Sequence, residues 1–97
     1  LREYLSDVIE DLEGPIYLSL DMDAVDPAFA PGVGTPEPLG MTPYEVIQTV
    51  NFFADRIVGF DCVEVCPPHD NGNTSALAAR LIRHLVGAVW QSQQRFK

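Results

Sequence analysis

Apolar residues recur every three or four positions in three segments of the chain, and two short apolar runs lie between those segments. The segments, residues 2–13, 42–55 and 74–96, have the spacing of amphipathic helices. The runs, residues 16–20 and 57–65, are too short for helices, and we predict strands, the first of them buried on both faces. Strands joined through a helix pair in parallel. The sequence therefore predicts an α/β fold of order α-β-α-β-α, a partial three-layer α/β/α arrangement around a parallel sheet.

Local signals mark the ends of the predicted helices. Gly14-Pro15 ends the first helix. We predict that Thr42 is the N-cap of the second helix and Pro43 its first residue, and that Glu45 completes a capping box with Thr42.

Residues 21–41 form the longest stretch without hydrophobic periodicity. The stretch holds four prolines and three glycines, which indicates an ordered but irregular loop. Loops longer than roughly 12–15 residues without secondary structure are uncommon in compact domains, so we expect this one to have a functional role.

The chain is short and acidic. Its 97 residues suffice for one small domain, and its 14 acidic and 6 basic residues give a net charge of −8. This charge repels phosphate backbones and anionic lipids, so we expect a cationic ligand and neither a nucleic-acid nor a membrane partner. Cys62 and Cys66 lack the spacing of a zinc site or a disulfide framework, which favours a reduced, cytoplasmic protein. Two parallel strands lack sheet neighbours, and the chain opens at Leu1, so we expect a piece of a larger domain.

The most informative residues follow the first predicted strand, in the sequence Ser19-Leu20-Asp21-Met22-Asp23. In an extended backbone, Asp21 and Asp23 would leave the strand on the same face. Two carboxylates so close repel each other, and a divalent ion between them would relieve the repulsion. Oxygen ligands suit Mg²⁺, Ca²⁺ or Mn²⁺. A solvated turn or a capping role is the alternative for this pattern taken alone.

Two further motifs accompany the acidic one: Pro31-Gly32-Val33-Gly34-Thr35-Pro36 in the loop and Phe60-Asp61-Cys62-Val63-Glu64-Val65 in the second predicted strand. Together with the Ser-x-Asp-x-Asp signature and its later proline, they resemble the ureohydrolase family, which includes arginase and agmatinase. The resemblance extends from Ile16 to Arg80, and its last motif is more similar to agmatinase than to arginase. It implies that residues 1–97 are the carboxyl-terminal part of a single ureohydrolase domain, a fragment of an arginase-like fold.

The resemblance also implies roles for individual residues. Asp21 matches the carboxylate that bridges two manganese ions in the binuclear centre of the family, and Asp23 matches a ligand of one ion. Glu64 matches the acid that binds the substrate guanidinium, and Thr35 matches a threonine near that group. The implied cofactor is Mn²⁺, two ions per complete site, and the implied partner is a small cationic guanidinium substrate. For Glu64 a surface carboxylate, and for Thr35 simple turn chemistry, are the alternatives.

For the other polar residues, their positions in the predicted elements favour structural roles or roles at the surface. Asp26 is expected to bond loop amides, and Asp61 to accept structural hydrogen bonds. His69 and Asp70 either line the entrance of the site or form an exposed loop pair. His84, among apolar helix neighbours, is expected at a core or interface position.

The family also has, earlier in its sequence, a histidine ligand and an Asp-Ala-His-x-Asp cluster, and these 97 residues contain neither. The resemblance therefore implies that the complete enzyme hydrolyses agmatine to putrescine and urea, in polyamine biosynthesis, and that this chain alone is inactive. Another ureohydrolase (arginase, guanidinobutyrase or formimidoylglutamase) is an alternative. So is a non-catalytic remnant that associates with a partner. We also expect a homo-oligomer.

Overall fold

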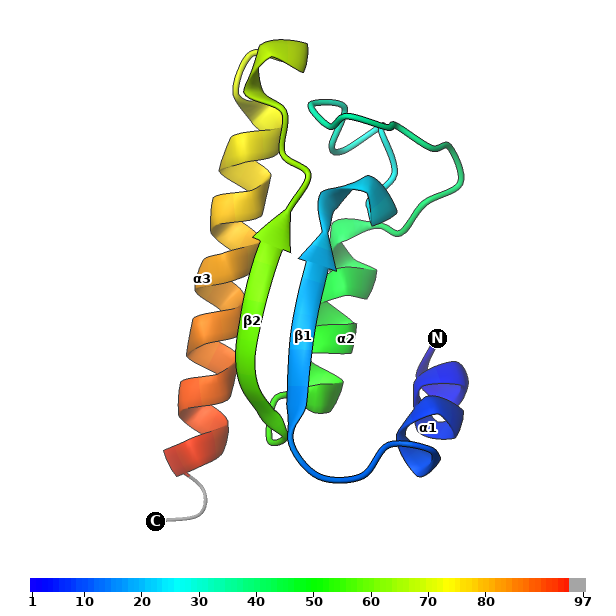
Figure 1. The fold of residues 1–97 in the computed structure, drawn as a ribbon, viewed down its shortest axis with the longest axis vertical. Helices are drawn as coiled ribbons and strands as arrows, with labels where there is room; N and C mark the ends of the chain where they lie inside the picture. The colour runs from blue at the N-terminus through cyan, green and yellow to red at the C-terminus, as the bar shows by residue number, and fades with distance from the viewer. Residues whose placement is uncertain (95–97) are drawn as a thin grey trace.

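The computed structural model describes residues 1–94 and has the predicted order of helices and strands (Figure 1). The helices are α1 (Arg2–Glu10), α2 (Pro43–Phe53) and α3 (Asn73–Gln94). The strands are β1 (Ile16–Asp21) and β2 (Ile57–Val63). Two short 3₁₀ helices follow the strands: η1 (Met22–Ala24) and η2 (Pro67–His69). The predicted α/β class and α-β-α-β-α order are confirmed.

The two strands pair in parallel, and the faces of their sheet differ. Leu18 and Leu20 of β1 lie opposite Phe60 and Cys62 of β2, and all four pack against the main core or belong to it. The alternate residues of β1, including Tyr17, are exposed. The prediction that the first strand is buried on both faces is therefore wrong for this chain. The reason is that α2 and α3 both cover the same face, so the chain contains the sheet and one of the helix layers.

The irregular loop of residues 21–41 is ordered because it contributes to the main core. Four of its side chains are almost completely buried in the cluster formed with α2 and α3: Met22, Val25, Ala30 and Val33. Fully burying a valine or methionine side chain stabilises the fold by about 1.5–3 kcal/mol. The loop is therefore held to the domain largely by buried side chains, a contribution to the core that the sequence analysis did not predict.

The first helix ends at Glu10, before the predicted end at Glu13, because the chain turns early toward β1. Arg56, which precedes β2, donates hydrogen bonds to the carbonyls of Leu12 and Gly14 at 3.0 and 2.7 Å. These bonds fix residues 12–14 outside the helix.

The second and third helices begin close to their predicted positions. The capping box is present: Thr42 Oγ1 accepts the Glu45 N–H at 3.2 Å, and Glu45 Oε1 accepts the Thr42 N–H at 3.0 Å. α3 begins at Asn73, and its predicted end at Phe96 lies outside the described residues. Among residues 1–94 no helix is both long and apolar enough to cross a membrane.

Candidate active site

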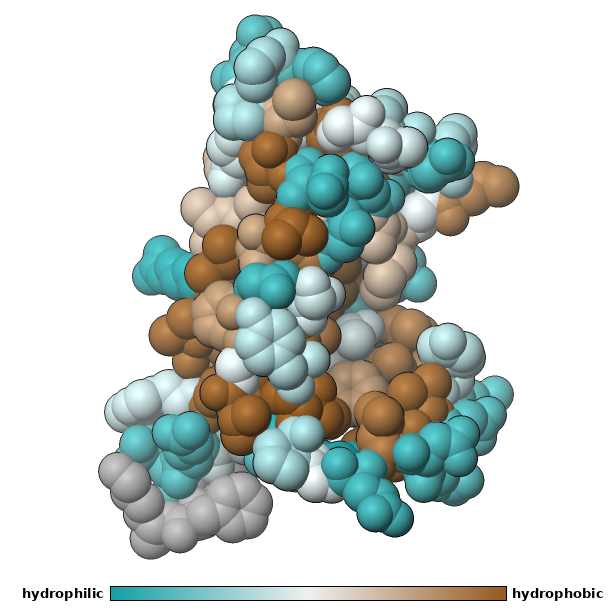
Figure 2. Space-filling model, in the orientation of Figure 1, coloured by the Kyte–Doolittle hydropathy of each residue, from teal (hydrophilic) through white to brown (hydrophobic). Residues whose placement is uncertain are grey.

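The candidate site lies at the carboxyl ends of β1 and β2. Asp21 is the last residue of β1 and lies opposite Val63, the last residue of β2, so Glu64 follows at the same edge. Figure 2 shows hydrophilic side chains gathered around this end of the strands, whereas hydrophobic side chains lie lower on the same face. In open α/β sheets this edge is where ligands bind.

Asp21 and Asp23 are linked by a hydrogen bond rather than by strand geometry. β1 ends at Asp21, and Asp23 lies in η1. Asp21 Oδ1 accepts the Asp23 N–H at 2.9 Å and so caps η1. The prediction that both carboxylates leave an extended strand on one face is wrong, because the backbone leaves the strand between them. One oxygen of Asp21 therefore has the helix-capping role that was the alternative to metal binding.

Asp23 has a polar atom that the surrounding protein does not satisfy. Its Oδ1 is buried and has no hydrogen-bond partner within the described part of the chain. Leaving such an atom unpaired costs about 1–3 kcal/mol, and a bound cation would remove that cost. Carboxylate oxygens of this kind fit Mn²⁺ and similar hard ions. Residues 1–94 contain no group of three or more His, Cys, Asp or Glu side chains arranged for a metal. The metal-binding roles of Asp21 and Asp23 stay predictions.

Glu64, which directly follows β2, has an unusual backbone conformation. Its φ of 72° lies in the left-handed region, which costs roughly 1–2 kcal/mol for a residue other than glycine and is most frequent at functional sites. β2 consequently ends at Val63 instead of the predicted Val65. Val65 instead makes an isolated antiparallel bridge with Val33 of the loop. This bridge brings the loop against the end of the strand.

The loop segment Gly32–Thr35 lies beside Glu64. A Cβ atom built on Gly34 would be 3.6 Å from Glu64 Oε2, and Thr35 is the exposed residue that follows. The Val33 carbonyl accepts a hydrogen bond from His69 Nδ1 at 2.7 Å. The structure therefore brings the segments of the two predicted substrate residues together, while their roles stay predictions.

His69 and Asp70, predicted as a pair, differ in their exposure to solvent. His69 is exposed, as in an exposed loop pair, whereas Asp70 is half-buried. Asp70 Oδ2 accepts the Thr74 hydroxyl at 2.6 Å and the Thr74 N–H at 2.9 Å, and Oδ1 accepts the Gly72 N–H at 3.0 Å. The hydroxyl bond is the largest of the causes that hold the pKa of Asp70 below its ordinary value.

Thr74 is a residue of this region that the sequence analysis missed. It is completely buried, and its hydroxyl oxygen accepts the Gly32 N–H at 2.7 Å. A signal was available in the sequence, because Asp70 shortly precedes the start of a predicted helix, where side chains commonly bond the first free N–H groups.

The structural roles predicted for Asp26 and Asp61 are confirmed. Asp26 accepts two loop N–H groups, at 2.9 and 3.1 Å. Asp61 accepts the hydroxyl groups of Ser19 at 2.6 Å and Tyr17 at 3.0 Å across the sheet. The Ser19 bond joins two residues that are register partners in the parallel pair.

Negative charge accumulates at the carboxyl edge. Burial, followed by the charges of Asp61 and Asp21, raises the pKa of the Cys62 thiol. A field of this sign favours a cationic ligand.

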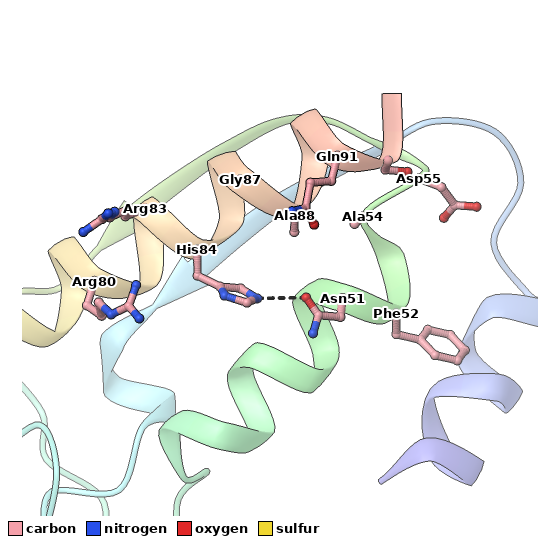
Figure 3. A pocket seen from close by; sticks show the side chains of 11 residues that line it. Asn51, Phe52, Ala54, Asp55, Arg80, Arg83, His84, Gly87, Ala88 and Gln91 are labelled. Carbon is pink, nitrogen blue, oxygen red and sulfur yellow. Dashed lines mark hydrogen bonds between the residues drawn. The ribbon is translucent and has the colours of Figure 1, made fainter. Parts of the chain in front are cut away.

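A groove of about 650 Å³ lies between α2 and α3, away from the carboxyl edge (Figure 3). Arg80 and Arg83 of α3 are among its lining residues. His84 Nε2 is 2.8 Å from Asn51 Oδ1 across the two helices. His84 is half-buried and lines this groove, so it lies outside the core, and its interface position stays a prediction.

Known proteins resemble this chain in sequence. The mitochondrial guanidino acid hydrolase of Homo sapiens is 47% identical over 77 residues, which are 77% of this chain and 22% of that protein. The guanidinopropionase of Pseudomonas aeruginosa is 52% identical over 84 residues, which are 84% of this chain and 26% of that protein. The chain therefore spans only a minor part of the length of these relatives.

The fold agrees with the sequence comparison. The crystal structure of the agmatine ureohydrolase of Thermoplasma volcanium superposes with a TM-score of 0.88 at 39% identity, covering 97% of this chain and 32% of that one. The two-stranded sheet and its helices are thus a fragment of the arginase-like α/β fold, as the sequence resemblance implies. Because the model of the arginase family matches residues 1–87, this chain belongs to the arginase family.

Proposed function

We propose that the complete protein hydrolyses a guanidinium C–N bond to release urea and an amine, and that this chain supplies part of the active site. The observation that supports the proposal most is that Asp21, Asp23 and Glu64 lie at or shortly after the carboxyl ends of two paired parallel strands, with an unsatisfied buried oxygen on Asp23. Agmatine is the first candidate substrate, which would place the reaction in polyamine biosynthesis.

Asp21 and Asp23 would hold Mn²⁺, two ions per complete site, together with ligands from outside this chain. When bound, such ions supply a water nucleophile at neutral pH by lowering the pKa of that water. The oxygen of Asp23 without a hydrogen-bond partner is the atom that best fits this role. Asp21 has one oxygen committed to the Asp23 N–H, which fixes the orientation of its carboxylate.

Glu64 would bind the guanidinium group of the substrate. A carboxylate pairs with a guanidinium through two parallel N–H···O bonds, which balance its charge and fix its plane. Fixing that plane presents the carbon to the nucleophile in one orientation, which lowers the entropic part of the barrier. Thr35, exposed beside Gly34, would offer its hydroxyl to the same group.

A guanidino acid is the second candidate substrate. Two of the relatives are a guanidino acid hydrolase and a guanidinopropionase, and their similarity to this chain favours a substrate with a carboxylate at its far end. Agmatine stays the first candidate because the motif of residues 60–65 is more similar to agmatinase than to arginase. The two substrates differ only at that far end.

We also propose a cytoplasmic homo-oligomer. Cys62 and Cys66 are both free thiols, which fits a reducing compartment. The net charge of −8 opposes association with nucleic acid or with an anionic membrane.

The full-length protein tests the proposal. Urea release is measured from agmatine, arginine, guanidinobutyrate, guanidinopropionate and formiminoglutamate, before and after removal of metal and with Mn²⁺ restored. We expect metal-dependent urea release, fastest with agmatine. Fastest turnover of guanidinobutyrate or guanidinopropionate would transfer the assignment to the second candidate. Absence of turnover on every compound with metal bound would support the non-catalytic remnant.

A further inference from the structure

A buried hydroxyl connects the loop of Thr35 to the segment that follows Glu64. Thr74, 0% exposed in the first turn of α3, accepts the Gly32 N–H at 2.7 Å and donates to Asp70 Oδ2 at 2.6 Å. Asp70 is itself held by the N–H groups of Thr74 and Gly72. The loop is thus bonded to a hydroxyl group that is itself held by a carboxylate, and that carboxylate cannot move without breaking several hydrogen bonds.

The contact at Gly32 leaves no room for a side chain. A Cβ atom built there would lie 2.5 Å from Asp70 Oδ2 and 2.7 Å from Oδ1. On its other side, the Gly32 carbonyl accepts the Cys66 N–H at 2.7 Å. Both backbone polar groups of Gly32 are therefore paired with residues that follow Glu64, which fixes the position and the direction of the loop.

We propose that Thr74 and Asp70 are positioning residues for the guanidinium site. They set the place of the segment Gly32–Thr35 relative to Glu64 and touch no substrate themselves. The inference rests on the proposed function, because Glu64 and Thr35 are taken as the groups that meet the guanidinium. Its physical basis is the short path from Gly32 to Gly34, whose Cβ position faces Glu64 Oε2. A displacement of about 1 Å at a reacting group can cost roughly 100-fold in rate.

A purely structural role makes a different prediction. If Thr74 and Asp70 only stabilise the start of α3, their loss lowers the free energy of unfolding and leaves the folded enzyme fully active. The positioning role requires loss of activity in protein that is folded and loaded with metal, and it requires that the hydroxyl be the group that matters.

The full-length enzyme carrying Thr74→Val or Thr74→Ser separates the two roles. Valine keeps the shape and removes the hydroxyl, whereas serine keeps the hydroxyl. We expect Thr74→Val to lower kcat/KM about tenfold at unchanged metal content, and Thr74→Ser to stay within about twofold of wild type. In a Thr35→Ala background the effect of Thr74→Val should shrink, because both changes act on the same segment.

Arg56→Leu is the matched control. It removes side-chain hydrogen bonds to the carbonyls of Leu12 and Gly14, at the end of the strands away from the site. We expect it to lower stability while kcat/KM stays unchanged, and to combine additively with Thr35→Ala. Equal kcat/KM in wild type and Thr74→Val, or equal losses in Thr74→Val and Thr74→Ser, would overturn the positioning role.

Amide hydrogen exchange provides a readout independent of turnover. We expect Thr74→Val to speed exchange at residues 32–35 selectively, and neither Thr74→Ser nor Arg56→Leu to do so. Unchanged exchange at residues 32–35 in Thr74→Val would overturn the inference by itself. If the wild-type enzyme releases no urea from any guanidinium compound, the proposed function fails, while the exchange comparison still decides whether Thr74 holds the loop.

Discussion

Glu64 faces Gly34 across the edge of the sheet, so that a Cβ atom on Gly34 would lie 3.6 Å from Glu64 Oε2. The contact joins the end of β2 to a loop that is distant in sequence. Glycine at this place leaves the carboxylate open on that side. The space it leaves is where we propose that the guanidinium group binds.

Gly34→Ala should therefore impair substrate binding without impairing the fold. The added methyl group makes only ordinary contacts, so the free energy of unfolding should change by about 0.5 kcal/mol or less. The methyl group would narrow the space beside Glu64, and KM for the guanidinium substrate should rise. Thermal unfolding and urea-release kinetics measure the two effects. Gly87→Ala, at a helix position with nothing within 4 Å of its Cβ, is the control, and a wild-type KM in Gly34→Ala would contradict the assignment.

Two substitutions of Glu64 separate the contribution of its charge to catalysis from the cost of its backbone strain to stability. Glu64→Gln keeps the shape and removes the charge, so metal content should survive while transition-state stabilisation falls by roughly 2–4 kcal/mol. Glu64→Gly should abolish activity as well, yet it should raise stability, because a φ of 72° is unstrained only for glycine. Metal analysis, kinetics and denaturant unfolding test both variants. Loss of manganese in Glu64→Gln would instead make this carboxylate a metal ligand.

Asp21→Asn and Asp23→Asn should each strip manganese and lower turnover by orders of magnitude, since a neutral amide is a poor replacement for a chelating carboxylate. Asp26→Asn is the matched control, because Asp26 bonds only loop N–H groups, and we expect it to retain metal at lower stability. Metal content per subunit and kcat are the measurements. Full metal content with near-normal kcat in both Asp21→Asn and Asp23→Asn would refute the ligand assignment.

Asp70 should make stability depend on pH in the acid range. Its pKa is lower in the folded protein than the ordinary value of 3.8, chiefly because the Thr74 hydroxyl donates to it. A lowered folded-state pKa stabilises the fold at pH values above the unfolded pKa, and this contribution is lost as pH falls through the folded value. Asp70→Asn should thus be less stable than wild type at neutral pH, with the difference shrinking below about pH 4. Urea unfolding at a series of pH values tests this, and a constant difference would exclude it.

The elements that the sequence predicts correctly are those set by neighbours along the chain. The capping box of Thr42 and Glu45 needs only residues three apart, and the helices follow from apolar spacing alone. The family resemblance likewise depends on short motifs. These features are local, so no knowledge of the tertiary structure is needed to infer them.

The features that the sequence does not reveal depend on contacts between distant residues. The Gly32–Thr74 hydrogen bond joins positions 42 residues apart. No sequence pattern in either segment predicts this bond. The strand geometry assumed for Asp23 is wrong because η1 begins directly after Asp21, where burial of Met22 in the core favours a turn. The exposure of Tyr17 depends on which face α2 and α3 cover, and the order of the elements leaves that choice open.

The 97-residue chain by itself should be inactive and should self-associate. Its described residues offer two carboxylates and no third metal-binding side chain placed with them, so manganese should bind weakly. Tyr17 and Val63, 63% and 40% exposed, lie on or beside the uncovered face, and a sheet of two strands has unpaired outer edges that attract further strands. We expect no urea from agmatine or arginine with added Mn²⁺, and concentration-dependent oligomers in sedimentation velocity. Tyr17→Lys, which places a charge on that face, should weaken the association. Turnover by a verified 97-residue product would show that ligands outside this chain are not required.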